Sequence, residues 1–427
     1  MFKNYVQRKL ENYVQQYLIA HPDIKLVCVA GSVGKTSTKL AIATVLSQQY
    51  RVRLHEGNHN ASLSAPLAIL GIEYPGSIRN PLAWWSVFRA AKQKVREPAS
   101  DVDVIIQELG TDRPGELPDF GRYLNPDIGV ITGVTAEHME FFGTLDAVAA
   151  EELSLANFSK IAIINRDDID DRYAQLIANP NISTYGTSGL AEYSYEVTDM
   201  TLGEGYQGLF TIPELPDGLP AKLFVLGEHA IRPISAAVTV AIRFGMAPEA
   251  ITQGVELIRP VHGRMNILRG VQDTILIDDT YNSSPAAAEM AIRTLDTLQA
   301  PQKIAVLGSM NELGATSAEA HRYIGSLCHP SSVQYVVTVG KEAMDYLAPA
   351  AAHNGCAVKS FPDALSAGAY VRKIIEPRAI VLLKGSQGGI FVEEATKMLL
   401  HSTSDDAQLV RQEPEWLEAK SQFFSKF

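Results

Sequence analysis

The sequence predicts an α/β fold in which mostly parallel strands alternate with helices. Short apolar runs recur along the chain and are separated by segments with helical periodicity, as is typical of strands buried on both faces. A glycine-rich turn also joins the first of these runs directly to a helical segment. A chain of 427 residues has the length of about two to four domains, so we expect more than one core.

The elements can be assigned in order along the chain. Apolar residues recur every four positions at the start, at Phe2, Val6, Leu10, Val14 and Leu18. They predict an amphipathic helix ahead of the first strand, 25–30, and a helix at 37–48 follows the glycine-rich turn. Further strands are predicted at 104–106, 128–132, 161–164, 275–277, 304–307, 336–339 and 380–383. Residues 184–224 are rich in Gly, Thr and Tyr and predict a small antiparallel element.

A proline and a glycine within 258–263 indicate a domain boundary between two sets of strands. The polar run 401–414 predicts a linker, and 415–427 is either a short terminal helix or a frayed tail. The expected organisation is an N-terminal helix at 1–23, a central domain at 24–260, a C-terminal domain at 261–400 and a tail at 401–427.

Residues 75–100 form an insertion in the central domain with the composition of an amphipathic surface helix. Two adjacent tryptophans, Trp84 and Trp85, precede the basic residues Lys92 and Lys94. One interpretation is that this helix contacts an anionic membrane surface or a partner protein. The other is that its apolar face packs on its own domain.

Composition excludes several classes of protein. The chain has 37 Lys and Arg against 48 Asp and Glu, a net charge of −11, which disfavours a nucleic-acid binder with a basic face. No apolar run approaches the roughly 18 residues of a membrane span, so we expect a cytoplasmic protein. Cys28, Cys328 and Cys356 are too few and too scattered for a disulfide framework or a zinc site, and are expected to be structural thiols.

The turn after the first strand, Gly31-Ser-Val-Gly-Lys-Thr36, has the composition of a phosphate-binding loop. Glycines let backbone N–H groups approach phosphate oxygens, Lys35 supplies positive charge, and the Thr36 hydroxyl can bind Mg²⁺. The longer form of this loop has a further glycine where this chain has Val29. The pattern predicts a site for ATP or GTP, with binding residues Gly31, Ser32, Gly34, Lys35, Thr36 and Ser37.

Several segments, taken together and in order, resemble the Mur ligases, and most closely the branch that adds D-alanyl-D-alanine. The segments are 31–39, Glu56-Gly-Asn-His-Asn60, Glu108-Leu-Gly-Thr-Asp-Arg-Pro-Gly-Glu116, Ile131-Thr-Gly-Val-Thr-Ala-Glu-His138, Asn165-Arg-Asp-Asp168, Gly263-Arg-Met265, Asp278-Asp-Thr-Tyr-Asn-Ser-Ser-Pro285, Val306-Leu-Gly-Ser-Met-Asn-Glu-Leu-Gly314 and Lys384-Gly-Ser386. The resemblance covers roughly 24–400. It implies a P-loop-containing central domain and a Rossmann-like C-terminal α/β domain.

The resemblance implies amide-bond formation through an acyl phosphate, with ATP and Mg²⁺ as cofactors. The catalytic residues would be Lys35, Glu108, His138 and Arg264. Thr36, Glu108 and His138 match metal ligands of the family. Where the family usually has a carbamylated lysine, an ungapped count reaches Glu152, which either replaces the carbamate or is merely solvated.

Other positions match the family's ligand contacts. For the nucleotide, they are Asn165, Asp168, Arg264, Asp279, Tyr281 and Asn282. For the substrates, they are Asn58, Asn60, Asn311, Glu312, Lys384 and Ser386. The chain departs from the family's nucleotide-contact pattern at Ala230 and Pro233, and from its amine-side pattern at Ser309 and Gln387.

Only about two dozen residues precede the first strand, so the family's usual N-terminal domain for the uridine-diphosphate end of the substrate is expected to be absent. The leading hypothesis is therefore a ligase that adds D-alanyl-D-alanine, or a similar amino acid or peptide, to a peptidoglycan-type precursor. The alternatives are a ligase for a lipid-linked precursor or a poly-amino acid, a plain P-loop ATPase or kinase, and a nucleotide-binding scaffold. The sequence predicts no oligomeric state.

Overall fold

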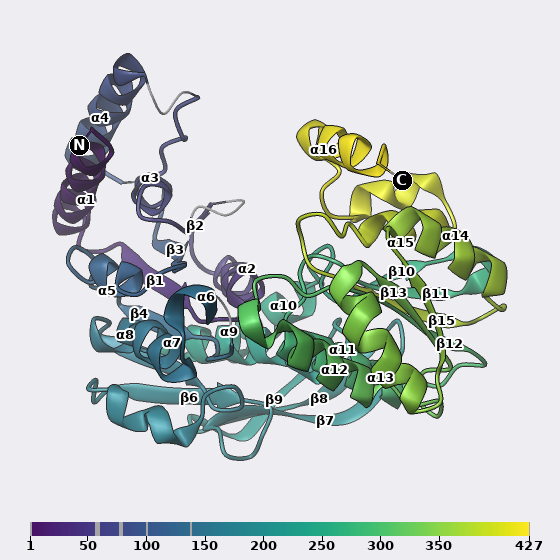
Figure 1. Ribbon diagram of the computed structural model, residues 1–427. Coiled ribbons are helices and arrows are strands. Elements are labelled where there is room, and N and C mark those ends of the chain that lie inside the picture. The colour runs from purple at the N-terminus through teal and green to yellow at the C-terminus, as the bar shows by residue number, and fades with distance from the viewer. Residues whose placement is uncertain (1, 56–59, 77–79, 100, 137–138, 427) are drawn as a thin grey trace. The chain divides into compact units, whose positions relative to one another are not determined.

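The computed structural model describes residues 2–55, 60–76, 80–99, 101–136 and 139–426 (Figure 1). These residues form two compact units. The first consists of the described residues of Met1–Asp199 with Gln207–Leu223 and Ile231–Ile258. The second consists of Met200–Tyr206, Phe224–Ala230 and the described residues of Arg259–Phe427.

A nine-stranded sheet in the order β2-β3-β1-β4-β5-β6-β7-β8-β9 organises the first unit. The strands are β1 (Lys25–Ala30), β2 (Val52–Leu54), β3 (Val104–Glu108), β4 (Ile128–Ile131), β5 (Ile161–Asn165), β6 (Ile182–Gly186), β7 (Tyr193–Thr201), β8 (Gly205–Ile212) and β9 (Leu215–Leu223). Pairing is parallel from β2 through β7. The connections 202–204 and 213–214 are too short for parallel crossovers, so β7, β8 and β9 run antiparallel.

Helices cover both faces of this sheet. They are α1 (Phe2–Ala20), α2 (Lys35–Leu46), α3 (Ser64–Leu70), α4 (Pro81–Arg96), α5 (Glu116–Phe120), α6 (Met139–Phe142), α7 (Leu145–Glu152), α8 (Ser154–Asn157), α9 (Ile231–Arg243) and α10 (Pro248–Leu257), with a 3₁₀ turn at η1 (Asp171–Leu176). Alternate residues of β1, including Leu26 and Cys28, share one core with α1, α5, α7 and α8. On the sheet, α2 contacts β1 and β3, and it also packs on α9 and α10.

The second unit contains a six-stranded sheet in the order β10-β11-β15-β12-β13-β14, in which only β10 is antiparallel. The strands are β10 (Asn266–Arg269), β11 (Ile275–Asp279), β12 (Lys303–Gly308), β13 (Tyr335–Val339), β14 (Ala357–Phe361) and β15 (Ile380–Lys384). The helices are α11 (Pro285–Thr297), α12 (Ser317–Leu327), α13 (Ala348–His353), α14 (Ala364–Ile374), α15 (Glu393–Leu399) and α16 (Pro414–Phe424). Short turns complete it at η2 (Glu228–Ala230), η3 (Val271–Asp273), η4 (Gly314–Thr316), η5 (Ala343–Leu347) and η6 (Thr403–Gln408).

The predicted α/β fold is confirmed, and each predicted strand is present. The prediction missed β2, β6, β10 and β14, which are short or only partly buried and lack a continuous apolar run. Within 184–224, β7, β8 and β9 are not a separate sheet, because they continue the large one through β6.

The helix predicted at the start of the chain is α1, but its buried side differs from the predicted one. Val6, Leu10 and Val14 are buried, whereas Phe2 is 46% exposed and Tyr17 is buried. A step of four residues advances about 400° around a helix, so a row with that spacing drifts by about 40° per step. The row therefore leaves the core at Phe2 and is only partly buried at Leu18, while a three-residue step from Val14 brings Tyr17 into the core.

The apolar face of α4 packs on its own unit, as the second interpretation of 75–100 states. Trp84 is 1% exposed and shares a core with Val6 and Leu10 of α1 and Leu67 of α3. Trp85, by contrast, is 63% exposed. Packing therefore accounts for one face of α4 and leaves its outward face unexplained.

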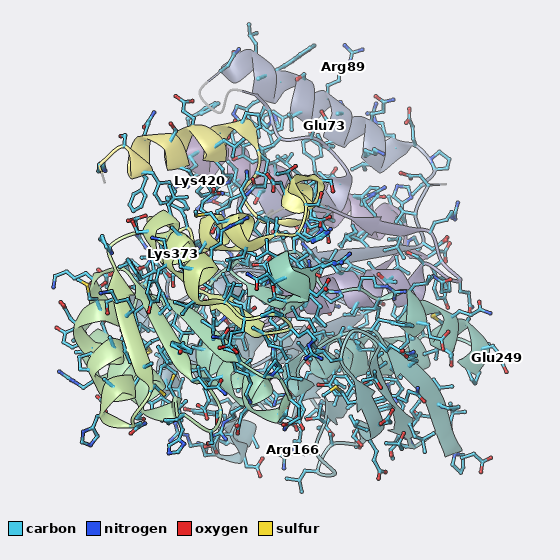
Figure 2. All side chains as sticks on the ribbon, turned by 90° about the vertical axis from the view of Figure 1, so that its right-hand side faces the viewer. Glu73, Arg89, Arg166, Glu249, Lys373 and Lys420 are labelled. Carbon is cyan, nitrogen blue, oxygen red and sulfur yellow. The ribbon has the colours of Figure 1, made fainter. Side chains whose placement is uncertain are left out.

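The C-terminal segment is held by buried charges. Glu393 of α15 is fully buried and accepts two hydrogen bonds of 2.8 Å from the Arg411 guanidinium. The Lys420 ammonium of α16, labelled in Figure 2, lies 3.0 Å from the same carboxylate and 2.7 Å from Glu394. The Phe423 ring also packs on Phe391, with centroids 5.3 Å apart. The segment thus forms a short helix that is anchored to the second unit, not a frayed tail.

The three cysteines are buried and free. Burial raises the pKa of the Cys328 thiol to about 12 and also raises that of Cys28. Their thiolates are therefore disfavoured, as expected of structural thiols. In the part of the chain that the structure describes, no helix is both long and apolar enough to span a membrane.

We predict that Arg411→Met lowers the free energy of unfolding by about 3–5 kcal/mol, because it removes one of two cations from a buried carboxylate. Urea unfolding monitored by circular dichroism measures this loss. Arg269→Met is the matched control, since Arg269 makes an exposed pair with Asp273 and its loss changes little. Equal stability of the two variants would contradict a stabilising role for the Glu393 cluster.

Candidate nucleotide-binding site

The phosphate-binding loop lies between β1 and α2, and its two glycines have backbone angles that favour glycine. Gly31 has φ of 129° and Gly34 has φ of 78°. A Cβ on Gly31 would lie 2.2 Å from the Thr132 hydroxyl and 2.8 Å from the Thr132 nitrogen. The end of β4 therefore approaches the loop so closely that no side chain fits at position 31.

The N-terminus of α2 begins directly after this loop. Gly34 is its N-cap, so no side chain at that position accepts hydrogen bonds from the first turn. Lys35 Nζ donates to the carbonyl oxygen of Gly31 at 2.5 Å, and the Ser32 hydroxyl accepts from the Thr135 nitrogen at 3.1 Å. Helix N–H groups that no side chain caps, beside a lysine, suit an anion such as a phosphate.

Glu108 ends β3 and is 4% exposed. Its carboxylate accepts a hydrogen bond of 3.2 Å from the Thr36 hydroxyl and lies 3.3 Å from Lys39 Nζ. The Asn60 amide donates to the other oxygen at 3.4 Å. A hydroxyl oxygen next to a carboxylate is a donor set that Mg²⁺ accepts, so Thr36 and Glu108 fit the expected metal.

Glu152 is the last residue of α7 and is 4% exposed, so the alternative that it is merely solvated is wrong. Its Oε2 accepts a hydrogen bond of 2.7 Å from the backbone nitrogen of Gly31. The carboxylate therefore lies directly against the phosphate-binding loop. Asn58 and His138, a predicted substrate residue and a predicted metal ligand, lie outside the described residues.

Asn165 and Asp168 also lie near the loop. The Asn165 amide donates to the carbonyl oxygen of Thr132 at 2.7 Å and to Asp168 at 2.8 Å. Burial raises the pKa of Asp168, and the opposing attraction of Arg232, whose guanidinium lies 2.8 Å away, is insufficient to cancel it. Gly133, between Thr132 and Val134, would place a Cβ 3.1 Å from the Cβ of Asp168.

In the second unit, a buried ion pair lies at the ends of β11 and β15. Lys384 Nζ is 2.6 Å from Asp279 Oδ2 and donates to the carbonyl oxygen of Asn282 at 3.0 Å. The other Asp279 oxygen accepts from the Met265 nitrogen at 3.2 Å. The neighbouring Asp278 is fully buried, and burial raises its pKa to about 7.

Arg264 and Tyr281 stack in the same region, with the guanidinium carbon 4.4 Å from the ring centroid. The Tyr281 nitrogen donates to the carbonyl oxygen of Gly263 at 3.0 Å, which holds the two segments together. Arg264 Nε is buried without a hydrogen-bond partner among the described residues. A buried donor of this kind is costly unless another group accepts from it.

Two of the predicted amine-side residues, Asn311 and Ser386, are hydrogen-bonded to each other. The Asn311 nitrogen donates to the Ser386 hydroxyl at 2.9 Å, and that hydroxyl donates to the carbonyl oxygen of Ser283 at 3.0 Å. The Asn311 amide also donates to the carbonyl oxygen of Gln387 at 2.7 Å. Glu312 is exposed and has φ of 62°, in the left-handed region.

Comparisons with known proteins identify the family. The Mur ligase middle domain matches residues 29–241, and the Mur ligase glutamate ligase domain matches residues 263–387. The chain belongs to the Mur ligase family.

The alignments with similar proteins span most of this chain. UDP-N-acetylmuramoyl-tripeptide–D-alanyl-D-alanine ligase of Bacillus subtilis is 27% identical over 387 residues, which are 88% of this chain and 76% of the relative. MurF from Acinetobacter baumannii has a TM-score of 0.74 at 21% identity, covering 91% and 79% of the two chains. MurF from Thermotoga maritima in complex with ADP has a TM-score of 0.72 at 22% identity, covering 92% and 83%.

Within each unit, this Mur ligase brings several of the predicted residues together. One group in the first unit comprises Gly31, Ser32, Lys35, Thr36, Asn60, Glu108, Glu152, Asn165 and Asp168. Another in the second unit comprises Asp279, Asn282 and Lys384. Sequence reasoning missed Lys39 and Arg232, which contact the first group. Lys39 follows Lys35 by four residues on α2, a spacing that indicates a shared helix face, but Arg232 had no comparable signal.

We predict that Gly31→Ala weakens ATP binding about 30-fold or more. An alanine at this positive φ is strained by about 1–2 kcal/mol. Its Cβ would also be overpacked against Thr132, at a further cost of about 1–3 kcal/mol. A Cβ at position 34 would meet no atom within 4 Å, so Gly34→Ala adds only the strain of the left-handed backbone conformation. We expect it to weaken ATP binding roughly 5- to 30-fold. Isothermal titration calorimetry measures both.

Gly189→Ala is the control for this series, because its Cβ meets no atom within 4 Å and its φ is not in the left-handed region. It is expected to bind ATP as the unmodified protein does. If Gly31→Ala bound ATP as well as Gly189→Ala, the close approach of β4 would not constrain the nucleotide site.

Proposed function

We propose that this Mur ligase is an ATP- and Mg²⁺-dependent carboxylate–amine ligase that adds D-alanyl-D-alanine, or a similar amino acid or peptide, to a peptidoglycan-type precursor in the cytoplasm. The main support is the group around the phosphate-binding loop, in which Thr36, Glu108 and Glu152 bring a hydroxyl and two buried carboxylates to the end of a parallel sheet. The names of the relatives support the substrates.

The first unit provides the groups that this chemistry requires. Thr36 and Glu108 would hold Mg²⁺, with His138 at a second metal, and Lys35 would neutralise phosphate charge. Bound ATP with Mg²⁺ supplies the phosphoryl group that converts a substrate carboxylate into an acyl phosphate, which an amine can attack. Lys39 holds the Glu108 carboxylate in place, because the two are a buried ion pair 3.3 Å apart.

We propose that Glu152 replaces the carbamylated lysine of other family members. Its burial supports this role, as does its 2.7 Å hydrogen bond from the Gly31 nitrogen, because negative charge is then available at the loop without CO₂. The same hydrogen bond orients the peptide of Gly31.

The second unit would contribute nucleotide and amine contacts. Arg264 has a buried Nε without a partner among the described residues and is therefore suited to an anionic acceptor. Asp279 is held by Lys384 and by the Met265 nitrogen, so its carboxylate is fixed in position. Asn60 in the first unit, and Asn311, Glu312 and Ser386 in the second, are the proposed substrate residues.

The ligase proposal predicts that ADP formation requires both a carboxylate precursor and an amine. Purified protein with ATP and Mg²⁺ is supplied with UDP-N-acetylmuramoyl-tripeptide, alone and together with D-alanyl-D-alanine, and the products are identified by mass spectrometry. The expected product is the amide of the two, with ADP and phosphate. ADP formation that does not change when any amine is added would support a plain ATPase or kinase instead. Binding of ATP without ADP formation would support a scaffold.

We predict that Glu152→Gln raises the Mg²⁺ concentration for half-maximal turnover by about tenfold or more, because it removes a charge near the metal while keeping an acceptor for the Gly31 nitrogen. A Mg²⁺ titration of ADP release measures the shift. Glu249→Gln, the same change at an exposed position of α10, is expected to leave the titration unchanged. Unaltered Mg²⁺ dependence in Glu152→Gln would show that Glu152 does not replace the carbamate.

A further inference from the structure

The helices α1 and α4 of the first unit pack against each other and concentrate positive charge in an acidic protein. Together they carry seven basic residues and one acidic residue, Glu11, whereas the whole chain has a net charge of −11. The basic residues are Lys3, Arg8, Lys9, Arg89, Lys92, Lys94 and Arg96. Of these, Lys94 pairs with Asp101 at 3.7 Å. This local excess favours an anionic ligand.

The outward face of α4 forms a single stripe at helical spacing. Its members are exposed and follow one another at steps of three and four residues, at Leu82, Trp85, Arg89, Lys92 and Arg96. The first two are large and apolar, with Leu82 77% and Trp85 63% exposed. Arg89, labelled in Figure 2, lies over the Trp85 ring at 5.9 Å. The stripe therefore has an apolar end followed by a cationic end.

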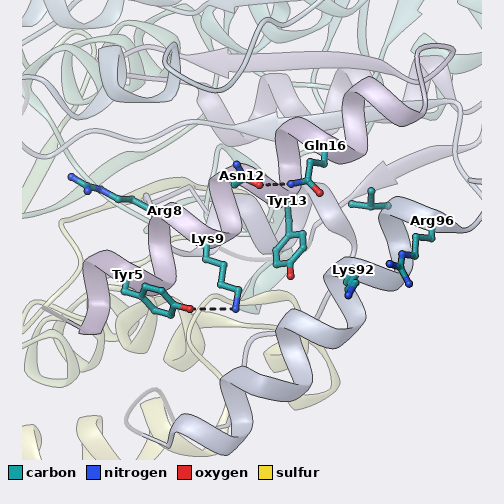
Figure 3. A pocket seen from close by; sticks show the side chains of 9 residues that line it. Tyr5, Arg8, Lys9, Asn12, Tyr13, Gln16, Lys92 and Arg96 are labelled. Carbon is teal, nitrogen blue, oxygen red and sulfur yellow. Dashed lines mark hydrogen bonds between the residues drawn. The ribbon is translucent and has the colours of Figure 1, made fainter.

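Between the two helices lies a groove of about 490 Å³ at the cationic end of this stripe (Figure 3). Four basic residues line it, together with polar and aromatic side chains of α1: Arg8, Lys9, Lys92 and Arg96, and Tyr5, Asn12, Tyr13 and Gln16. Lys9 Nζ lies 4.2 Å from the Phe88 ring centroid and 3.3 Å from the Tyr5 hydroxyl. These contacts position one of the cations at the groove.

We propose that the outer face of α1 and α4 binds the surface of a bilayer that contains anionic phospholipids. In this arrangement, Leu82 and Trp85 would enter the headgroup region, and Arg8, Lys9, Lys92 and Arg96 would contact lipid phosphates. A helix with a cationic stripe and exposed Trp and Leu has the composition of an interfacial membrane helix. A nucleic acid or an acidic protein would account for the cations but not for the apolar end of the stripe.

This surface is separate from the proposed ligase chemistry. Among the described residues, no hydrogen bond or ion pair joins this surface to the phosphate-binding loop group. The packing of α4 on the core uses a different face of the helix, through Trp84 and Val87. Binding would hold the protein at a membrane, and it does not depend on which substrates the ligase uses. The two proposals can therefore fail independently.

The test is co-sedimentation of the full chain with vesicles of phosphatidylcholine alone or of phosphatidylcholine mixed with phosphatidylglycerol. We expect binding only to the mixed vesicles, decreasing as salt is added, because salt screens exposed charges. Lys92→Gln with Arg96→Gln should weaken binding roughly 30-fold, at about fivefold per basic residue near an anionic surface. Trp85→Ser should weaken it while leaving its salt dependence intact.

Lys359→Gln with Lys373→Gln is the matched control, because it removes the same charge from two exposed positions of the second unit. It should bind mixed vesicles as the unmodified protein does, and both double variants should retain ATP binding. Equal binding to neutral and mixed vesicles, or equal loss in the two double variants, would overturn the proposal. So would binding to a single-stranded oligonucleotide with no binding to vesicles.

Discussion

The close approach of Gly31 to the end of β4 is the constraint on which the first unit's candidate site depends. One side of this peptide faces Thr132 at a distance that excludes a Cβ, and its nitrogen donates to the buried Glu152 carboxylate. Thr132 in turn accepts a hydrogen bond from Asn165 through its carbonyl oxygen. Three strand ends and α7 therefore hold one loop, so that its backbone is preorganised before any ligand binds.

Buried charge plays a comparable part in the second unit. Asp279 and Lys384 form one pair at the strand ends, and Arg411 joins Glu393 to the carbonyl oxygens of Thr280 and Tyr281. Lys420 extends this network to α16. A buried network of this kind is stable only when every member is paired, which ties the candidate site segment 278–282 to the last helix of the chain.

The two faces of α4 separate stability from surface chemistry. Trp84 contributes to a core with α1 and α3, while the neighbouring Trp85 is exposed beside Arg89. Adjacent residues on a helix differ by about 100° in direction, so Trp84 and Trp85 lie on different faces of α4. The composition of 75–100 indicated an amphipathic helix, but only packing showed which tryptophan is available for a ligand.

The sequence by itself determined the α/β fold, the phosphate-binding loop and the family, because these depend on local signals: apolar runs, two glycines before a lysine, and an ordered set of motifs. Tertiary structure alone decided that Glu152 is buried against Gly31, that Lys39 and Arg232 belong to the candidate site, and that α16 is anchored by Glu393. Each of these findings either joins residues that are far apart in sequence or distinguishes a buried side chain from an exposed one. Such contacts arise only when the fold brings together elements that are distant in sequence, among them the strand ends that meet at one edge of a sheet.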